Sequence, residues 1–150
     1  MLKYYLAYGS NLNLEQMEWR CPGAELIGTG DLPDYKMTFR SHNRRGGVAN
    51  IEPCKGAKVK FGLFTIGRID EAALDRYEGY PWLYKKQFIP VEVDGKLYLA
   101  MVYVMCDGYQ LAEPNQTYID IIEQGYRDCG FDVHEFNDWV VANRQAMQNE

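Results

Sequence analysis

The chain has few histidines, no paired cysteines and no long apolar run, and each absence excludes a class of protein. Its 150 residues include only His42 and His134 as histidines, and its four cysteines are widely spaced. No Cys-x-x-Cys pair occurs, so we expect neither a zinc site nor a disulfide scaffold. No apolar run approaches the ~20 residues of a membrane-spanning helix, and no signal peptide is visible. We therefore expect a cytoplasmic protein with reduced thiols, no metal and no membrane association.

The commonest catalytic and nucleotide-binding motifs are also missing. The sequence contains no Gly-x-Ser-x-Gly elbow, no Walker loop and no complete Gly-x-Gly-x-x-Gly. With two histidines available as bases, Ser10 is a poor candidate for the nucleophile of a Ser-His hydrolase. The net charge of −5 argues against a nucleic-acid partner, so an anionic ligand would need a local patch or backbone donors.

What the sequence does contain is typical of a single globular domain spanning residues 1–150. Hydrophobic residues make up 47% and charged residues 25% of the chain, enough to bury one core at this length. The unusual feature is tyrosine, of which there are twelve. Most of these rings must pack in the core, and the remainder are available to place hydroxyl groups in a pocket.

The pattern of apolar residues predicts an α+β protein. Strands are expected over 3–8, 24–32, 35–40, 48–52, 59–66, 87–93 and 97–105. The first two helices are expected up to residue 20, capped by Asn11 or Asn13, and over 69–78; two more follow residues 115 and 132. Pro33-Asp34 and Asp94-Gly95 are predicted turns, and the glycines at 28–30 indicate a bulge or bend. So many short strands favour a small, mostly antiparallel curled sheet or barrel that carries helices.

The stretch Leu-Ala-Tyr-Gly-Ser-Asn-Leu, residues 6–12, lies between the first strand and the first helix. On residue types alone, a strand-to-helix turn with a capping Asn or Ser is the favoured interpretation. A functional interpretation is compatible with it. Successive backbone N–H groups beside a helix start form a concave donor site for a carboxylate or carbonyl oxygen, and Gly9 lets a ligand approach closely.

A second local feature is Glu78, in the last turn of the helix expected over 69–78 and just before Gly79. A negative charge there opposes the helix dipole and costs about 0.3–1 kcal/mol. A solvated carboxylate at a frayed helix end is the commoner case, whereas a locally unfavourable residue is also a mild indication of function. The basic loop at 44–47 favours a solvated surface over an anion site.

Taken together, several segments resemble the γ-glutamylcyclotransferase family. They are LAYGSNL, RRGGVANIEP, VKFGLFTI and LDRYEGYPWLY, followed by a C-terminal region that begins YVMCDGYQLAEPNQTYIDII. The similarity extends over nearly the whole chain, with several motifs in matching order and spacing. It implies a small mixed, mostly antiparallel β-barrel with surrounding helices.

The resemblance also implies which residues form the site. Glu78 would be the catalytic glutamate. Tyr103 and Tyr118 would match pocket tyrosines, as would Tyr84, whose spacing from the glutamate is one residue shorter than in the family. The γ-glutamyl group would be held by the loop residues Tyr8, Gly9, Ser10, Asn11 and Leu12.

The implied reaction converts a γ-glutamyl amino acid or amine to 5-oxoproline and the free amino acid or amine. The substrate's own α-amine attacks its γ-carbonyl, so no cofactor and no metal is required. The alternatives are a catalytically inactive AIG2-like protein that binds small molecules or partners through the same pocket, and a general interaction domain. The identity of the leaving group, and whether the protein is a monomer or a homodimer, stay open.

Overall fold

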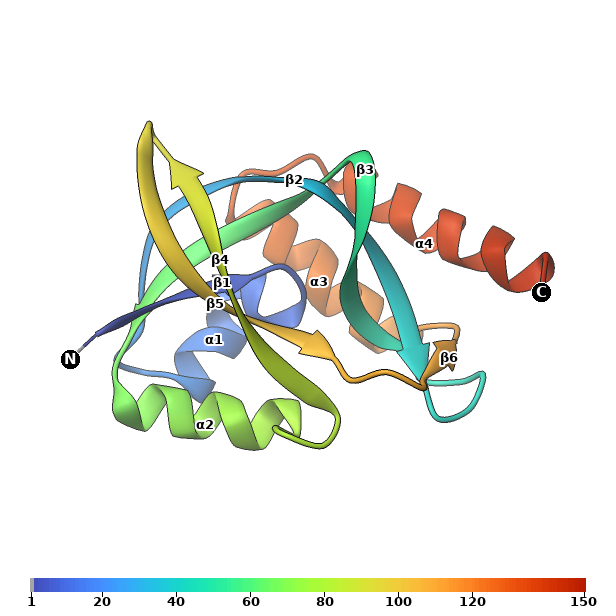
Figure 1. The fold of residues 1–150 in the computed structure, drawn as a ribbon, viewed down its shortest axis with the longest axis horizontal. Coiled ribbons are helices and arrows are strands. Elements are labelled where there is room, and N and C mark those ends of the chain that lie inside the picture. Colours follow the sequence, from blue (N-terminus) through green and yellow to red (C-terminus); the bar gives the residue numbers. More distant parts are fainter. Residues whose placement is uncertain (1) are drawn as a thin grey trace.

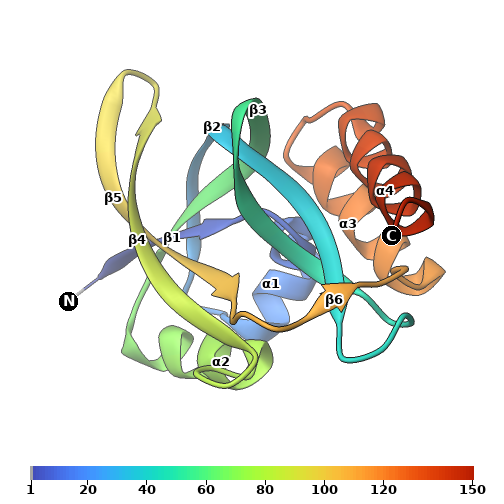
Figure 2. The same ribbon diagram turned by 45° about the vertical axis from the view of Figure 1, so that its right-hand side comes forward.

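A computed structural model describes residues 2–150 and contains one strongly curled six-stranded sheet with helices around it (Figures 1 and 2). The strands are β1 (Lys3–Ala7), β2 (Glu25–Ser41), β3 (Val48–Ile66), β4 (Tyr84–Val93), β5 (Lys96–Met105) and β6 (Gln110–Leu111). Their order is β4-β5-β1-β3-β2-β6, with β1 parallel to β5 and every other pair antiparallel. The predicted α+β fold with a mixed, mostly antiparallel barrel-like sheet is confirmed.

The strands β2 and β3 are longer than predicted, and the breaks expected after residues 32 and 52 are wrong. They run without interruption for 17 and 19 residues. The bulge expected near residues 28–30 is present as a register shift between Leu26 and Gly28. The predicted turn at Pro33-Asp34 is instead a register shift between Pro33 and Tyr35, at which Asp34 takes a left-handed φ of 64°. Gly56 of β3 donates its N–H to the Asp34 carboxylate at 2.9 Å. This irregular bulge sets Asp34 opposite residues 54–57 of β3, while Pro33 stays paired with Lys58, and both strands continue past it.

The helical elements are the 3₁₀ turn η1 (Ser10–Leu12) and the helices α1 (Leu14–Arg20), α2 (Arg68–Glu78), α3 (Gln116–Asp128) and α4 (Val133–Gln148). Short polar side chains cap α1, α3 and α4, whereas η1 and α2 begin after glycines. Asn13 accepts a hydrogen bond from the N–H of Gln16, and Asn115 accepts one from Tyr118, so both predicted caps are confirmed. Gly79, with φ at 67°, ends α2 directly after Glu78. No helix among residues 2–150 is long and apolar enough to cross a membrane.

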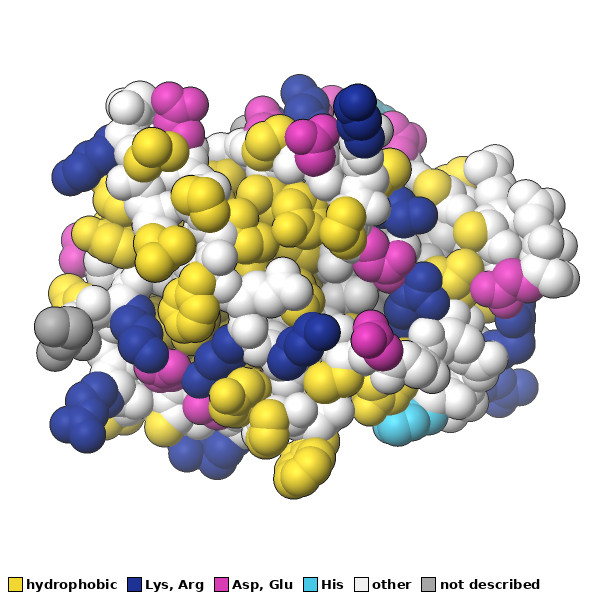
Figure 3. All heavy atoms as spheres, in the orientation of Figure 1, with side chains coloured by type: hydrophobic (Ala, Val, Ile, Leu, Met, Phe, Trp, Pro, Cys, Tyr) yellow, Lys and Arg dark blue, Asp and Glu magenta, His cyan; other side chains and the backbone are white. Residues whose placement is uncertain are grey.

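The hydrophobic core fills the inside of the curled sheet and continues beneath the two C-terminal helices. Figure 3 shows apolar side chains at the centre of one face, between the β4–β5 ribbon and the β2–β3 ribbon, with charged side chains around them. The largest fully buried side chains include Phe39, Phe61, Tyr126 and Phe136. Figure 2 shows α3 and α4 together on one side of the sheet, where α4 packs on β2.

The turn η1 is placed by a close contact with α3. Gly125 of α3 lies so near this turn that a Cβ atom on it would be 2.6 Å from the Asn13 nitrogen and 2.7 Å from the Leu12 carbonyl carbon. Asn13 also donates its side-chain N–H to the Ile121 carbonyl of α3 at 3.1 Å. The helix therefore fixes the position of the loop that follows β1.

We expect Gly125→Ala to destabilise the protein by about 1–3 kcal/mol, because the added methyl group meets backbone atoms that cannot turn aside. Urea unfolding would report this as a lower midpoint. Thr117→Ala, an exposed substitution in the same helix, is the matched control and should leave the midpoint nearly unchanged. Equal midpoints for Gly125→Ala and the wild type would contradict the close contact.

Candidate active site

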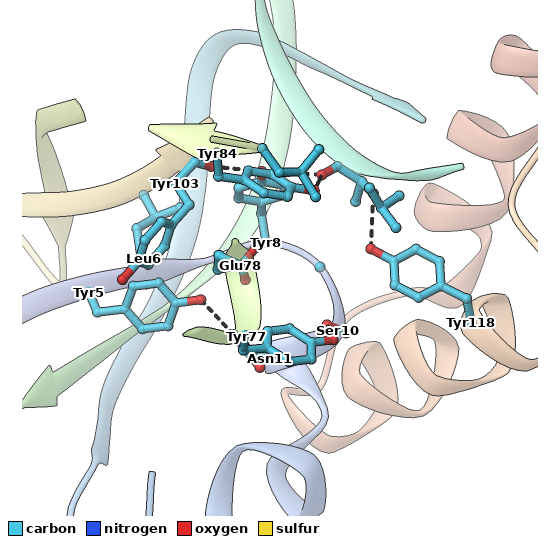
Figure 4. A pocket seen from close by; sticks show the side chains of 14 residues that line it. Tyr5, Leu6, Tyr8, Ser10, Asn11, Tyr77, Glu78, Tyr84, Tyr103 and Tyr118 are labelled. Carbon is cyan, nitrogen blue, oxygen red and sulfur yellow. Dashed lines mark hydrogen bonds between the residues drawn. The ribbon is translucent and has the colours of Figure 1, made fainter. Parts of the chain in front are cut away.

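A cavity of about 290 Å³ opens where β1, η1, the end of α2 and the strands β4 and β5 meet (Figure 4). Tyrosine rings and aliphatic side chains make up most of its wall, and tyrosine hydroxyls and the backbone of the loop after β1 add polar groups. It is lined by Tyr5, Leu6, Tyr8, Gly9, Ser10, Asn11, Val48, Ala49, Tyr77, Glu78, Leu83, Tyr84, Tyr103 and Tyr118. Glu78 is the one residue with a formal charge in this lining.

The Glu78 carboxyl group occupies a position with little solvation. It is the last residue of α2, and Figure 4 shows it in the middle of the labelled side chains, near Tyr8 and Tyr77. No side chain of residues 2–150 is hydrogen-bonded to the carboxylate. Burial raises the pKa of Glu78 from 4.5 to about 7, and the positive charge of Arg20 partly opposes this rise. A carboxyl group with such a pKa exchanges protons readily near neutral pH.

The loop after β1 presents backbone donors to the same cavity. The side chains of Ser10 and Asn11 are engaged with the protein: Ser10 Oγ lies 2.9 Å from the Tyr77 hydroxyl, and Asn11 Nδ2 donates to the Tyr5 hydroxyl at 2.8 Å. Within residues 2–150, the backbone N–H groups of Ser10 and Asn11 have no acceptor. Such free donors at the start of a helical turn suit an anionic or carbonyl oxygen.

Ser10 is not placed to act as an activated nucleophile. Its hydroxyl contacts a tyrosine rather than a histidine, and neither His42 nor His134 lines the cavity. The same part of the chain, residues 2–150, holds no group of three His, Cys, Asp or Glu side chains placed to hold a metal ion. The chemistry available in the cavity is thus proton transfer by a carboxyl group and hydrogen bonding by backbone and tyrosine donors.

Two tyrosines on the β1 and β4 side donate their protons to backbone carbonyls. The Tyr8 hydroxyl donates to the Tyr103 carbonyl at 2.8 Å, and the Tyr84 hydroxyl donates to the Ala49 carbonyl at 2.5 Å. Burial raises the pKa of both phenols, so both stay neutral. These bonds join the β1, β3, β4 and β5 walls of the cavity and hold its shape.

Tyr118 and Tyr103 differ in what their hydroxyl protons can reach. The Tyr118 hydroxyl accepts the N–H of Ala49 at 2.9 Å, so its own proton is available to a ligand. The Tyr103 hydroxyl donates to Asp75 at 2.6 Å. Lys86 pairs with the same aspartate at 3.0 Å, which holds the ring of Tyr103 against α2. Of these two tyrosines, Tyr118 is therefore the one that can donate to a bound molecule.

Eight of the nine residues predicted for the site line the cavity, whereas Leu12 does not. The Leu12 side chain is fully buried in the core, where it packs near Gly62 of β3 and Gly125 of α3. The tight 3₁₀ turn places it on the side opposite the cavity.

Tyr5 and Tyr77 also line the cavity, although no sequence motif indicates either of them as a site residue. Tyr77 is adjacent to Glu78 at the end of α2, and this adjacency is the only sequence signal for it. Tyr5 carries no local signal, because its role depends on a hydrogen bond with Asn11 that forms only in the folded chain.

The sequence is similar to a known protein family and to curated proteins. Residues 5–127 match the model of a family described as γ-glutamyl cyclotransferase, AIG2-like. The chain is 28% identical to a γ-glutamylcyclotransferase of Bos taurus over 137 residues, covering 84% of this chain and 71% of that protein. It is 29% identical to the γ-glutamylcyclotransferase of Homo sapiens with the same coverage.

Solved structures show the same arrangement of strands and helices. One described as a γ-glutamyl cyclotransferase superposes with a TM-score of 0.82 at 26% identity, covering 93% of this chain and 86% of that one. YkqA from Bacillus subtilis superposes with a TM-score of 0.77 at 21% identity, covering 93% of this chain and 54% of YkqA, and so shares the fold.

The burial of Glu78 predicts how stability depends on pH. Because the folded-state pKa of Glu78 is raised, the ionised form destabilises the fold, and wild-type stability falls as pH rises from about 4.5 to 7. Glu78→Gln removes this cost. We expect its advantage in unfolding free energy over the wild type to grow by about 2–3 kcal/mol between pH 5 and pH 8, as urea unfolding would measure.

The matched control for this prediction is Glu15→Gln, which changes an exposed carboxylate on α1. Its difference from the wild type should be the same at both pH values. A pH-independent difference for Glu78→Gln as well would show that Glu78 is not desolvated.

Proposed function

The chain belongs to the γ-glutamyl cyclotransferase, AIG2-like family, and from this premise we propose that it is a γ-glutamylcyclotransferase. It would convert a γ-glutamyl amino acid or a γ-glutamyl amine to 5-oxoproline and release the free amino acid or amine. The curated relatives that carry this name support an enzyme of this type. The observation that carries the proposal is the lone, poorly solvated carboxyl group of Glu78 beside a loop of free backbone donors.

The proposed reaction is an intramolecular acyl transfer. The nitrogen of the substrate's α-amine forms a bond to the γ-carbonyl carbon, and the bond from that carbon to the leaving nitrogen breaks. Since nucleophile and electrophile belong to one molecule, the enzyme gains mainly by holding the substrate in its reactive conformation. The narrow cavity with rigid tyrosine walls suits this task.

Glu78 would act as general base and then as general acid. An ammonium group cannot attack a carbonyl, so the α-ammonium group first gives up one proton, which passes to solvent. The Glu78 carboxylate accepts a second proton from the same nitrogen as that nitrogen bonds to the γ-carbonyl carbon. The protonated carboxyl group then returns a proton to the leaving nitrogen, which departs as a neutral amine. A pKa of about 7 suits both directions, because the ionised and protonated forms are then similar in free energy near neutral pH.

The remaining groups would bind the substrate and stabilise charge. The free N–H groups of Ser10 and Asn11 are suitable donors to the substrate's α-carboxylate or to the oxyanion that develops on the γ-carbonyl. The Tyr118 hydroxyl adds a third donor from α3. Tyr8, Tyr84 and Tyr103 would shape the cavity around the γ-glutamyl group, and Gly9 leaves space for it.

We expect Glu78→Gln to lower turnover of γ-glutamyl amino acids and amines by about 10²–10⁴-fold, because the amide side chain cannot accept the proton. The measurement is release of 5-oxoproline from a panel of such compounds at pH 7.5. Glu15→Gln on the protein surface should retain the wild-type rate. Equal turnover by the wild type and Glu78→Gln would exclude this role for Glu78.

The same panel addresses the alternative of an inactive AIG2-like binding protein. A wild-type protein that turns over no member of the panel, yet is stabilised by 5-oxoproline in a thermal-shift experiment, would favour that alternative over an enzyme.

Tyr118→Phe tests the proposed third donor. We expect kcat/KM to fall about 5–30-fold, corresponding to about 1–2 kcal/mol for a lost hydrogen bond to the reacting molecule. Tyr109→Phe, whose hydroxyl lies outside the cavity, is the control and should keep the wild-type value. An unchanged kcat/KM for Tyr118→Phe would show that its proton does not reach the substrate.

A further inference from the structure

We propose that Arg20, which lies outside the cavity, is a positioning residue of the site: it holds the donor loop and Tyr77, the neighbour of Glu78 at the end of α2, in place. This inference rests on the proposed function, and it adds a residue that neither the motifs nor the cavity lining indicates.

The guanidinium of Arg20 makes three contacts at the end of α1. Its Nη1 donates to the side-chain oxygen of Asn11, and its Nη2 donates to Gln16 Oε1 at 2.9 Å. Its central carbon lies 3.5 Å from the centroid of the Tyr77 ring. The edge of the planar guanidinium thus donates to Asn11 of the loop, and its face stacks on the Tyr77 ring of α2. A lysine cannot make both contacts.

These contacts connect the two halves of the site. Asn11, which accepts from Arg20, also donates from Nδ2 to the Tyr5 hydroxyl at 2.8 Å. The Tyr77 hydroxyl in turn lies 2.9 Å from Ser10 Oγ. The loop that presents the free N–H groups and the helix end that carries Glu78 are therefore held by one side chain. Loss of the guanidinium would release both Asn11 and the Tyr77 ring.

Arg20 is also the positive charge whose effect reaches Glu78. The other ionisable groups that line the cavity with that carboxylate are phenols: Tyr5 on β1, Tyr8 just after β1, Tyr77 on α2, Tyr84 on β4, Tyr103 on β5 and Tyr118 on α3.

The nearby cation on β4, Lys86, is paired with Glu71 at 2.7 Å and with Asp75 at 3.0 Å, so its charge is balanced locally. Arg20 lowers the pKa of Glu78 against the effect of burial. It thereby keeps a larger fraction of the carboxylate ionised at neutral pH, as a general base requires.

The test compares the pH dependence of 5-oxoproline release by the wild type, Arg20→Met and Arg20→Lys. For Arg20→Met we expect the acid limb of kcat/KM to move upward by about 0.5 pH or more, because the charge is lost. Arg20→Lys should keep the wild-type midpoint but raise KM, because it retains the charge and loses the planar fork. Arg127→Met, an exposed charge deletion on α3, should match the wild type.

A second readout does not depend on activity. In substrate-free protein, the ¹³C chemical shift of the Glu78 carboxyl carbon reports its titration directly. We expect a higher midpoint in Arg20→Met than in the wild type or Arg127→Met. An unchanged Glu78 titration together with a wild-type KM in Arg20→Met would overturn the proposal.

The two proposals fail separately in this design. A wild type without turnover on any γ-glutamyl compound would contradict the proposed function, while the titration would still test Arg20. Urea unfolding checks that the variants fold. If Arg20→Met does not fold, Arg20→Lys carries the test, and a wild-type KM together with a wild-type midpoint would overturn the positioning role.

Discussion

The close contact between Gly125 of α3 and the 3₁₀ turn after β1 is the constraint on which the site depends. It fixes the position of the loop against α3, and the Asn13 cap then fixes where α1 begins. Arg20 at the end of α1 contacts both Asn11 and Tyr77, and Tyr77 lies next to Glu78 at the end of α2. Segments more than a hundred residues apart in the chain are therefore needed to place one carboxyl group.

Local features of the fold were predictable, and those that depend on a partner strand were not. The Asn13 and Asn115 caps and the Asp94-Gly95 turn follow from residue chemistry within a few positions. By contrast, Pro33-Asp34 is compatible with both a turn and a bulge, and only the pairing of β2 with β3 makes it a bulge.

The site divides in the same way. Taken alone, the loop at residues 6–12 and Glu78 each favour a plain structural interpretation. Their role in a site is predicted only by the resemblance of several motifs, in matching order, to a family. Tyr5 and Tyr77 act through hydrogen bonds that only the folded chain reveals. Leu12 shows the limit of transferring a whole motif, because one step along a 3₁₀ turn moves a side chain from the cavity into the core.

The open edges of the sheet bear on whether the protein aggregates in concentrated solution. Exposed strand edges are templates for pairing with other chains. Here β6 is only two residues long, and β4 carries the exposed Lys85 and Pro90 along its length. A short strand, a positive charge and a missing N–H group each discourage edge-to-edge growth. The barrel can thus stay open beside its cavity without offering a continuous surface for aggregation.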